Sequence, residues 1–285
     1  MPMPAPDSAT LSTELSPFST AYARLHEVFP PLRVVEGPPR QGNGWITPSE
    51  LTEDGPATAA FLAHDAEQVR RDYGQEALPH VVAAFALHRY AWPVSLLVTL
   101  PWFLLRRVPH LDADALSFHR GSGQLTVAVE RFSCLPRDPA AGLPGALVVD
   151  DEEELRARVR SQVADQLAPV LDSFRVRTRR GTQALWGMVT DAMTEGLWYV
   201  GGLLDEEERA IQDAGRLLPG RTTPFRRGAA FRELAAPDGR ALTTRDRASC
   251  CLFYTLRPDD ACVTCPRTRD GERLRRLLAA TAEAG

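Results

Sequence analysis

The sequence predicts an α+β fold that is mainly helical, with a small antiparallel sheet and a cysteine-rich loop near the C-terminus. Long stretches of helical character recur along the 285 residues, several of them begun by proline or by clustered acidic residues. Residues 114–131 instead show the two-residue period of strands. Four of the five cysteines fall within residues 250–265. With 44% hydrophobic and 25% charged residues, the chain has an ordinary globular composition and can bury a sizeable core.

Start signals identify the helices. Ser16 and Pro17 resemble an N-cap followed by proline at the first helical position. Acidic residues crowd the first turns at 151–154 and 205–208, where the helix dipole favours them. The predicted helices span residues 17–28, 54–74, 78–105 (as two helices), 151–168, 182–200, 205–218 and 271–283. Residues 1–15, rich in Pro, Ser and Thr, are expected to form a flexible leader.

The most apolar part of the chain is residues 90–105, which carry no charge between Arg89 and Arg106. This segment is interrupted by two prolines and is shorter than the ~20 residues that span a bilayer. Because proline kinks or breaks a helix, we expect two buried core helices that meet near Pro93. The sequence therefore predicts no transmembrane segment.

Strands are expected in three places. Residues 32–35 form a short strand, and a loop rich in glycine and proline follows it. Residues 115–129 form a hairpin around a turn that contains Gly121 and Gly123. After another Pro/Gly loop and the long helices, residues 232–244 hold a second short hairpin.

The net charge of the chain and its expected cellular compartment limit the classes of function that it can have. The net charge of −4 argues against nucleic-acid binding, which usually requires a strongly basic protein. The N-terminus shows neither the basic nor the apolar region of a secretory signal, so we expect a cytoplasmic protein. Thiols stay reduced in the cytoplasm, and clustered cysteines there are more often metal ligands than disulfides.

The cysteine pattern indicates a metal centre. Cys250 and Cys251 are adjacent, and Cys262 and Cys265 form a C-x-x-C that can chelate one metal ion. Four thiolates favour zinc or iron–sulfur chemistry. Structural zinc sites usually use two pairs of spaced cysteines, so the adjacent pair is unusual for zinc. Because two irons give adjacent thiolates more room than one small ion, we favour a [2Fe–2S] cluster.

This C-C-x10-C-x2-C pattern, with Phe253 and Tyr254 after the first pair, resembles the FhuF-type siderophore-iron reductases. The resemblance implies that the four cysteines ligate a [2Fe–2S] cluster. Two other stretches, residues 185–188 and 84–109, resemble the family more loosely. We accordingly divide the chain into a helical α+β domain, residues 1–245, and a cluster-binding segment with a terminal helix, residues 246–285. The cluster ligands are expected to be Cys250, Cys251, Cys262 and Cys265.

Other candidate residues have structural interpretations. Isolated Cys134 is expected to be a small buried hydrophobe. The six histidines lack the spacing of a metal site and are expected at the surface or satisfied in the core; they are His26, His64, His80, His88, His110 and His119. The run of Arg175, Arg177, Arg179 and Arg180 is interpreted as a solvated face, with attraction of an anionic chelate as the alternative. Trp186 and Trp198 are expected to pack in the core, or else to line a chelate pocket.

The resemblance implies an enzyme, a ferric-siderophore reductase that delivers one electron to chelated Fe³⁺ and releases Fe²⁺ in the cytoplasm. Dinucleotide, P-loop and nucleophile-elbow motifs are absent from the sequence. Electrons must then come from an external donor, a ferredoxin or a flavoprotein reductase. Two alternatives remain: a zinc-stapled binding module without redox activity, and an iron–sulfur electron-transfer protein of another pathway.

Overall fold

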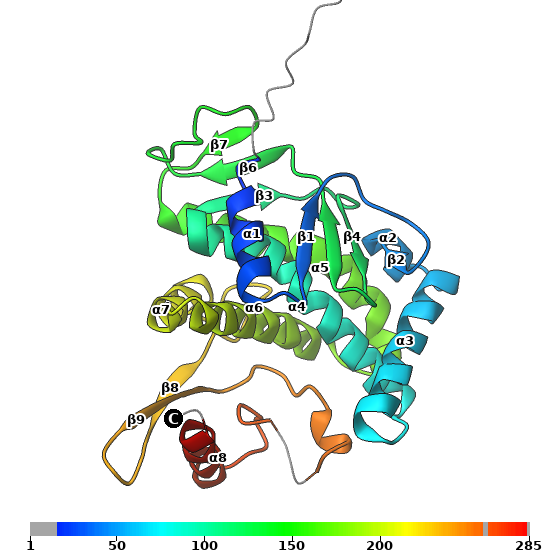
Figure 1. Ribbon diagram of the computed structural model, residues 1–285, viewed down its shortest axis with the longest axis vertical. Coiled ribbons are helices and arrows are strands. Elements are labelled where there is room, and N and C mark those ends of the chain that lie inside the picture. Colours follow the sequence, from blue (N-terminus) through cyan, green and yellow to red (C-terminus); the bar gives the residue numbers. More distant parts are fainter. Residues whose placement is uncertain (1–15, 259–261, 284–285) are drawn as a thin grey trace, which may run out of the picture.

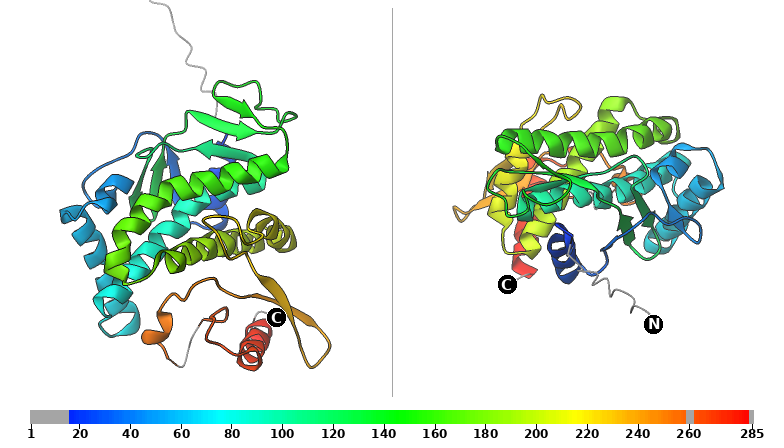
Figure 2. Two further views of the ribbon diagram at one scale, coloured as in Figure 1. Left: turned by 180° about the vertical axis from the view of Figure 1, so that it is seen from behind. Right: turned by 90° about the horizontal axis from the view of Figure 1, so that it is seen from above.

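The structure is a computed structural model that describes residues 16–258 and 262–283. It confirms a mainly helical α+β fold with small sheets and a C-terminal segment rich in cysteine. The predicted leader, residues 1–15, lies outside the described residues. Helices and short strands form the body, and the C-terminal segment lies beneath helix α6 (Thr182–Leu203), away from the two larger sheets (Figures 1 and 2). The division into two domains stays a prediction.

The body is built around α4 (Pro79–Leu105), which is apolar on every side, as expected of a helix surrounded by other elements. Helices α5 (Glu152–Thr178) and α6 pack against it, and α7 (Glu207–Leu217) packs against α6. Among the described helices, α4 alone has the length and composition to cross a membrane, and most of its apolar stretch is buried inside the fold.

The predicted break at Pro93 is wrong, because α4 continues through both Pro93 and Pro101. Proline inside a helix costs about 3 kcal/mol. Side chains along this helix are nonetheless almost completely buried between α5 and α6, and that burial outweighs the lost hydrogen bond. Helix α5 likewise passes Pro169 and ends ten residues later than predicted.

Other helices begin and end close to the predicted positions. Helix α3 (Pro56–Tyr73) ends at Gly74, whose φ of 67° is the left-handed conformation that glycine adopts easily. Helix α1 (Ser19–Val28) begins two residues after Pro17. Helix α8 (Asp270–Glu283) closes the described chain. The short helices α2 (Pro48–Thr52) and η1 (Phe253–Thr255) were not predicted.

Strands form three sheets rather than one sheet and a hairpin. The predicted central hairpin is confirmed as antiparallel β4 (Leu116–His119) and β5 (Gln124–Val127), and the predicted N-terminal strand, β1 (Arg33–Glu36), pairs with β5 in parallel. A two-residue strand, β2 (Trp45–Ile46), completes this sheet beside β4.

The second sheet falls in segments where no strand was predicted. It contains β3 (Arg107–His110), β6 (Arg131–Cys134) and β7 (Ala146–Val148), and β6 and β7 run parallel. Strand β3 follows α4 almost directly and contains Pro109, a residue that argues against a strand when only the sequence is known. The third sheet is the predicted C-terminal hairpin, β8 (Phe231–Ala235) with β9 (Ala241–Arg245), and it leads directly into the cysteine loop.

Candidate metal centre

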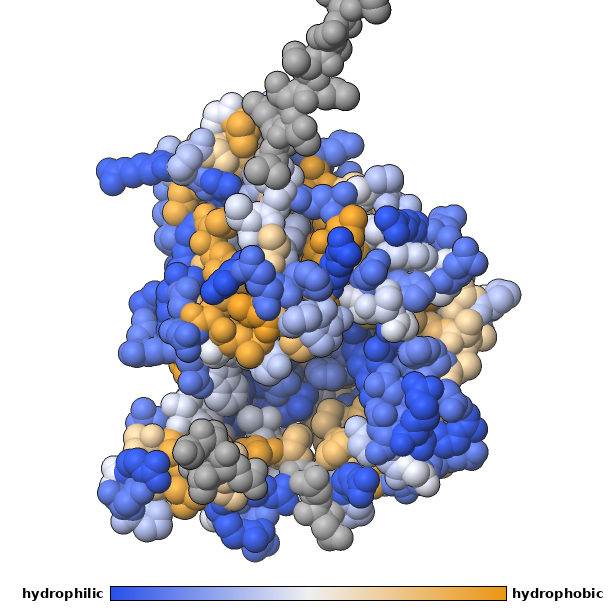
Figure 3. Space-filling model, viewed as in Figure 1, coloured by the Kyte–Doolittle hydropathy of each residue, from blue (hydrophilic) through white to orange (hydrophobic). Residues whose placement is uncertain are grey.

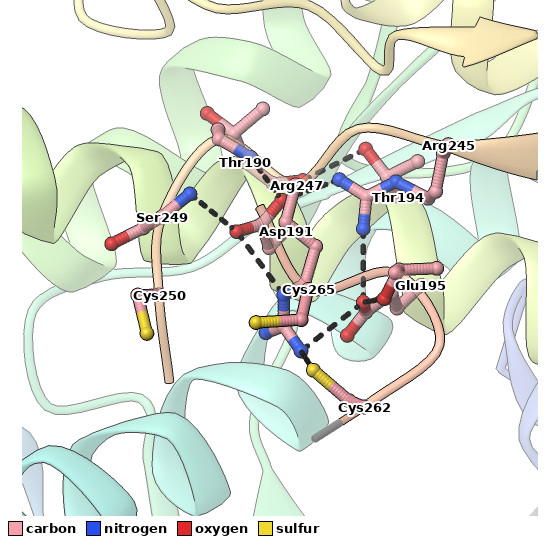
Figure 4. A network of polar contacts seen from close by, with 12 residues as sticks. Thr190, Asp191, Thr194, Glu195, Arg245, Arg247, Ser249, Cys250, Cys262 and Cys265 are labelled. Carbon is pink, nitrogen blue, oxygen red and sulfur yellow. Dashed lines mark hydrogen bonds and ion pairs between the residues drawn. The ribbon is translucent and has the colours of Figure 1, made fainter. Parts of the chain in front are cut away.

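Asp191 on α6 anchors the start of the cysteine loop. Its side chain is completely buried, and it accepts hydrogen bonds from the backbone N–H groups of Ala248 and Ser249, each at 2.8 Å (Figure 4). Gly187, one turn earlier on α6, leaves room for this approach, because a Cβ there would lie 2.9 Å from the Ala248 carbonyl oxygen. The loop is thus held by its backbone immediately before Cys250.

Two arginines that flank Asp246 complete a buried network of ion pairs. Arg245 is fully buried and pairs with Asp191 and, at 2.9 Å, with Glu195. Arg247 lies 3.5 Å from Asp191 through Nε and 3.4 Å from Glu195 through Nη1. Two carboxylates therefore balance two guanidinium groups. A buried network of this kind loses several kcal/mol when one partner is removed, because the remaining charge is left unpaired.

The second cysteine pair is fastened by the terminal helix. Arg273 of α8 is almost fully buried and donates to the backbone oxygens of Arg245 and Cys265, at 3.2 and 3.1 Å. On the other side, Arg180 donates to the backbone oxygen of Cys250. Helices α6 and α8 and the short connection between α5 and α6, which carries Arg180, therefore hold the two ends of one loop.

The four motif cysteines are free thiols, and the structure brings two of them into contact. The Cys262 thiol donates a hydrogen bond to Cys251; this lowers the pKa of Cys251 below its usual range and raises the pKa of Cys262. Cys250 lies close enough for electrostatic interaction with Cys251 and Cys265, while burial raises its pKa. In residues 16–258 and 262–283, no three His, Cys, Asp or Glu side chains are grouped so that they could hold a metal ion.

The surroundings of the sulfurs fit an iron–sulfur cluster. Cys250 Sγ accepts the Leu252 N–H at 3.4 Å, Cys265 Sγ accepts the Arg267 N–H at 3.5 Å, and Arg247 Nη1 lies 3.9 Å from Cys262 Sγ. Arg247 Nη2 is buried and has no hydrogen-bond partner among the described residues. A [2Fe–2S] cluster takes four cysteine thiolates over two irons and is tuned by hydrogen bonds to sulfur. The four thiols and the Nη2 donor of Arg247, free within the described residues, match that requirement.

The other candidates lie elsewhere or serve the loop indirectly. Cys134 is completely buried in β6, as predicted. None of the histidines belongs to a metal-holding group within the described chain. His88 is the histidine on which Arg247 acts; burial first, and then this positive charge, lower its pKa to about 4. In the arginine run, Arg175 and Arg179 are exposed as predicted, whereas Arg180 contacts the cysteine loop.

Sequence reasoning missed the residues that hold the loop, above all Asp191, Glu195 and Arg273. A signal for the first two was present: they are two acids four residues apart in an otherwise apolar helix. Residues at that spacing share one helix face, so both can meet the same pair of arginines. For Arg273 no such signal existed, because arginine is common along the final helix.

The loop carries four free cysteines and is held at both ends by buried charged side chains, and four cysteine thiols are the donor set that thiolate metal centres use. Residues 247–267 match the family model of the FhuF 2Fe-2S C-terminal domain. The match covers the cysteine loop alone, and a [2Fe–2S] cluster is the cofactor for which that domain is named. Among curated proteins, none matches this chain.

Proposed function

We propose that the protein is a ferric-siderophore reductase, an enzyme that passes one electron to siderophore-bound Fe³⁺. The observation that carries the proposal is the FhuF-type match, which falls on the loop that Asp191 fastens to the body and Arg273 to the terminal helix. Siderophores hold Fe³⁺ with hard anionic oxygens, and Fe²⁺ is a softer, less charged ion that these oxygens bind far less tightly. Reduction therefore frees the iron without breaking a covalent bond of the chelator.

Cys250, Cys251, Cys262 and Cys265 are the residues that we propose hold the cluster. When bound, a [2Fe–2S] cluster supplies electrons one at a time. Arg247 places a positive charge beside the sulfurs of Cys251 and Cys262, and Asp191 and Glu195 keep the guanidinium in position. We further propose that the reaction takes place in the cytoplasm and that the electrons come from a ferredoxin or a flavoprotein reductase.

Anaerobic mixing tests the proposal. Protein purified anaerobically should show visible iron–sulfur absorption, and after reduction it should release Fe²⁺ from a ferric siderophore into a ferrous-specific chelator. A colourless, zinc-loaded protein would favour the binding-module alternative. A coloured protein that is inert toward hydroxamate, catecholate and citrate chelates would instead favour an electron carrier of another pathway. The matched control is the Cys250→Ser variant, which should release no Fe²⁺.

A further inference from the structure

The surface beside the cysteine loop is hollowed where the C-terminal segment meets the body (Figure 3). A cavity of about 340 Å³ lies between α4, the end of α1 and the first sheet, and a more open depression of about 520 Å³ runs along α6. Glu195 lines both, and we call the two together the hollow. These volumes are in the range of ligand-binding sites. The residues of the hollow that matter here are Phe29, Trp92, Arg120, Glu195, Tyr199 and Thr264.

The hollow reaches the proposed cluster loop directly. Thr264 lies between Cys262 and Cys265 in the sequence and lines the depression, where its hydroxyl donates to Glu195 at 3.4 Å. Glu195 in turn contacts Arg247, which lies 3.9 Å from Cys262 Sγ. A molecule bound in the hollow would therefore touch the segment that carries the second cysteine pair.

Three aromatic rings in mutual contact join the two parts of the hollow and form its aromatic wall: Phe29 and Trp92 line the cavity, and Tyr199 lines the depression. Phe29 packs edge-on against Trp92 at 5.7 Å and against Tyr199 at 5.6 Å between ring centroids, and Trp92 lies 6.3 Å from Tyr199. Tyr199 remains 49% exposed, although it is a large side chain. An exposed aromatic face of this kind is typical of a surface that a ligand covers.

The cavity end of the hollow has more positive than negative groups. Arg89 and Arg120 both line it, and both pair with the same buried carboxylate, Asp65, at 2.5 and 3.3 Å. Arg120 Nε is buried and has no hydrogen-bond partner within the described part of the chain. Glu195 does not offset this surplus, because it is already shared by Arg245 and Arg247. The one further acid, Glu207, lies in the depression and accepts from Trp198.

From these features we infer that the hollow is the binding site for an anionic ferric chelate, with Arg120 and Arg89 facing its negative oxygens and the aromatic wall contacting its organic part. The inference rests on the proposed function and adds to it a location and a charge preference. A chelate of three catecholates carries three negative charges, whereas a ferric trihydroxamate is neutral. Opposite charge in a partly buried site favours the former.

Binding can be measured without reduction by replacing Fe³⁺ with Ga³⁺, which has the same charge but is not reduced under these conditions. Titration calorimetry on the purified holoprotein should show tighter binding of the gallium tris-catecholate than of the gallium trihydroxamate. The Arg120→Gln variant should bind the tris-catecholate about tenfold more weakly, as expected when a hydrogen bond to a charged group is lost. Its affinity for the trihydroxamate should stay unchanged.

Two further variants protect the test against misfolding and non-specific charge effects. Tyr199→Ala removes a half-exposed ring and should weaken both chelates, whereas Tyr199→Phe should bind like the wild type. Arg240→Gln changes an exposed arginine on the remote hairpin, paired with Asp238, and should leave both affinities unchanged.

The outcomes separate this inference from the proposed function. Wild-type affinity for both chelates in Arg120→Gln and Tyr199→Ala would overturn the hollow as the site, even if the wild type reduces ferric chelates. Equal or tighter binding of the neutral chelate would overturn the charge preference. Binding that depends on the hollow, without any release of Fe²⁺ from the iron forms, would support the site and contradict the reductase.

Discussion

Arg247 is the residue that joins the buried charges to the cysteine loop. It is 7% exposed, pairs with Asp191 and Glu195, and points one N–H toward Cys262 Sγ. A positive charge beside a cluster stabilises the reduced form, which carries one more negative charge. We therefore expect Arg247→Gln to lower the midpoint potential by about 59 mV, which corresponds to a tenfold change for a one-electron couple.

Spectroelectrochemical titration of the two proteins checks this expectation. Arg247→Lys keeps the charge and should shift the potential less. Arg257→Gln alters another arginine of the segment, which stacks on Tyr73 and should leave the potential in place. A midpoint that is unchanged in Arg247→Gln, in a variant that retains its full iron content, would contradict the role of this side chain.

The proposed cysteine ligands can likewise be tested by single substitutions. Replacing Cys250 by serine exchanges a soft thiolate for a hard hydroxyl, which suits iron–sulfur chemistry poorly. The normal visible spectrum and the iron content of two atoms per chain should therefore be lost, as expected of a Cys₄ two-iron site. Cys134→Ser is the matched control, because Cys134 is buried in β6 and outside the loop. An unchanged spectrum in Cys250→Ser would remove this residue from the ligand set.

At the scale of elements, the contact between α6 and the cysteine loop depends on Gly187. A methyl group at this position would meet the backbone of Ala248 at 2.9 Å, and backbone cannot yield as a flexible side chain does. Gly187→Ala should push the loop away from Asp191 at a cost of about 1–3 kcal/mol. We expect a lower unfolding temperature and a lower iron content per chain.

Gly215→Ala provides the comparison for that substitution. Gly215 lies on the exposed side of α7, with no atom within 4 Å of an added Cβ. Alanine is the better helix former by up to about 1 kcal/mol, so this variant should be as stable as the wild type or more stable. If Gly187→Ala behaves in the same way, the close approach does not matter for the site.

Elements with local signals were predictable from the sequence, and those that depend on distant partners were not. Gly74 ends α3 because its own backbone conformation requires glycine, and the turn between β4 and β5 is encoded in its glycines. The continuity of α4 through Pro93 depends on neighbours far away in the sequence. The same holds for the site: the cysteine spacing is local, whereas Asp191 meets Arg245 across 54 residues.

At the scale of the whole molecule, a charge of the C-terminal segment, on Arg247, affects the protonation of a buried histidine of the body, His88. This histidine lies on α4, and burial followed by the positive charge of Arg247 lowers its pKa from 6.5 to about 4; Asp191 opposes this change and Arg89 adds to it. His88 Nδ1 is buried and has no hydrogen-bond partner in the part of the chain described. The folded protein therefore holds this ring neutral.

This arrangement predicts how the stability of the molecule depends on pH. Between pH 6.5 and about 4 the unfolded chain binds a proton at His88 and the folded chain does not. Acid therefore favours unfolding. The part of the free energy of unfolding that depends on neutral His88 is fully present above pH 6.5, and it falls by at most about 3 kcal/mol as the pH falls toward 4.

His88→Asn should lose less stability than the wild type between pH 7 and pH 4.5 in urea unfolding. Subtracting the two curves removes acid effects common to both proteins, and His26→Gln, at an exposed position on α1, should follow the wild type. Parallel curves for wild type and His88→Asn would show that burial of His88 does not link the stability of the molecule to pH.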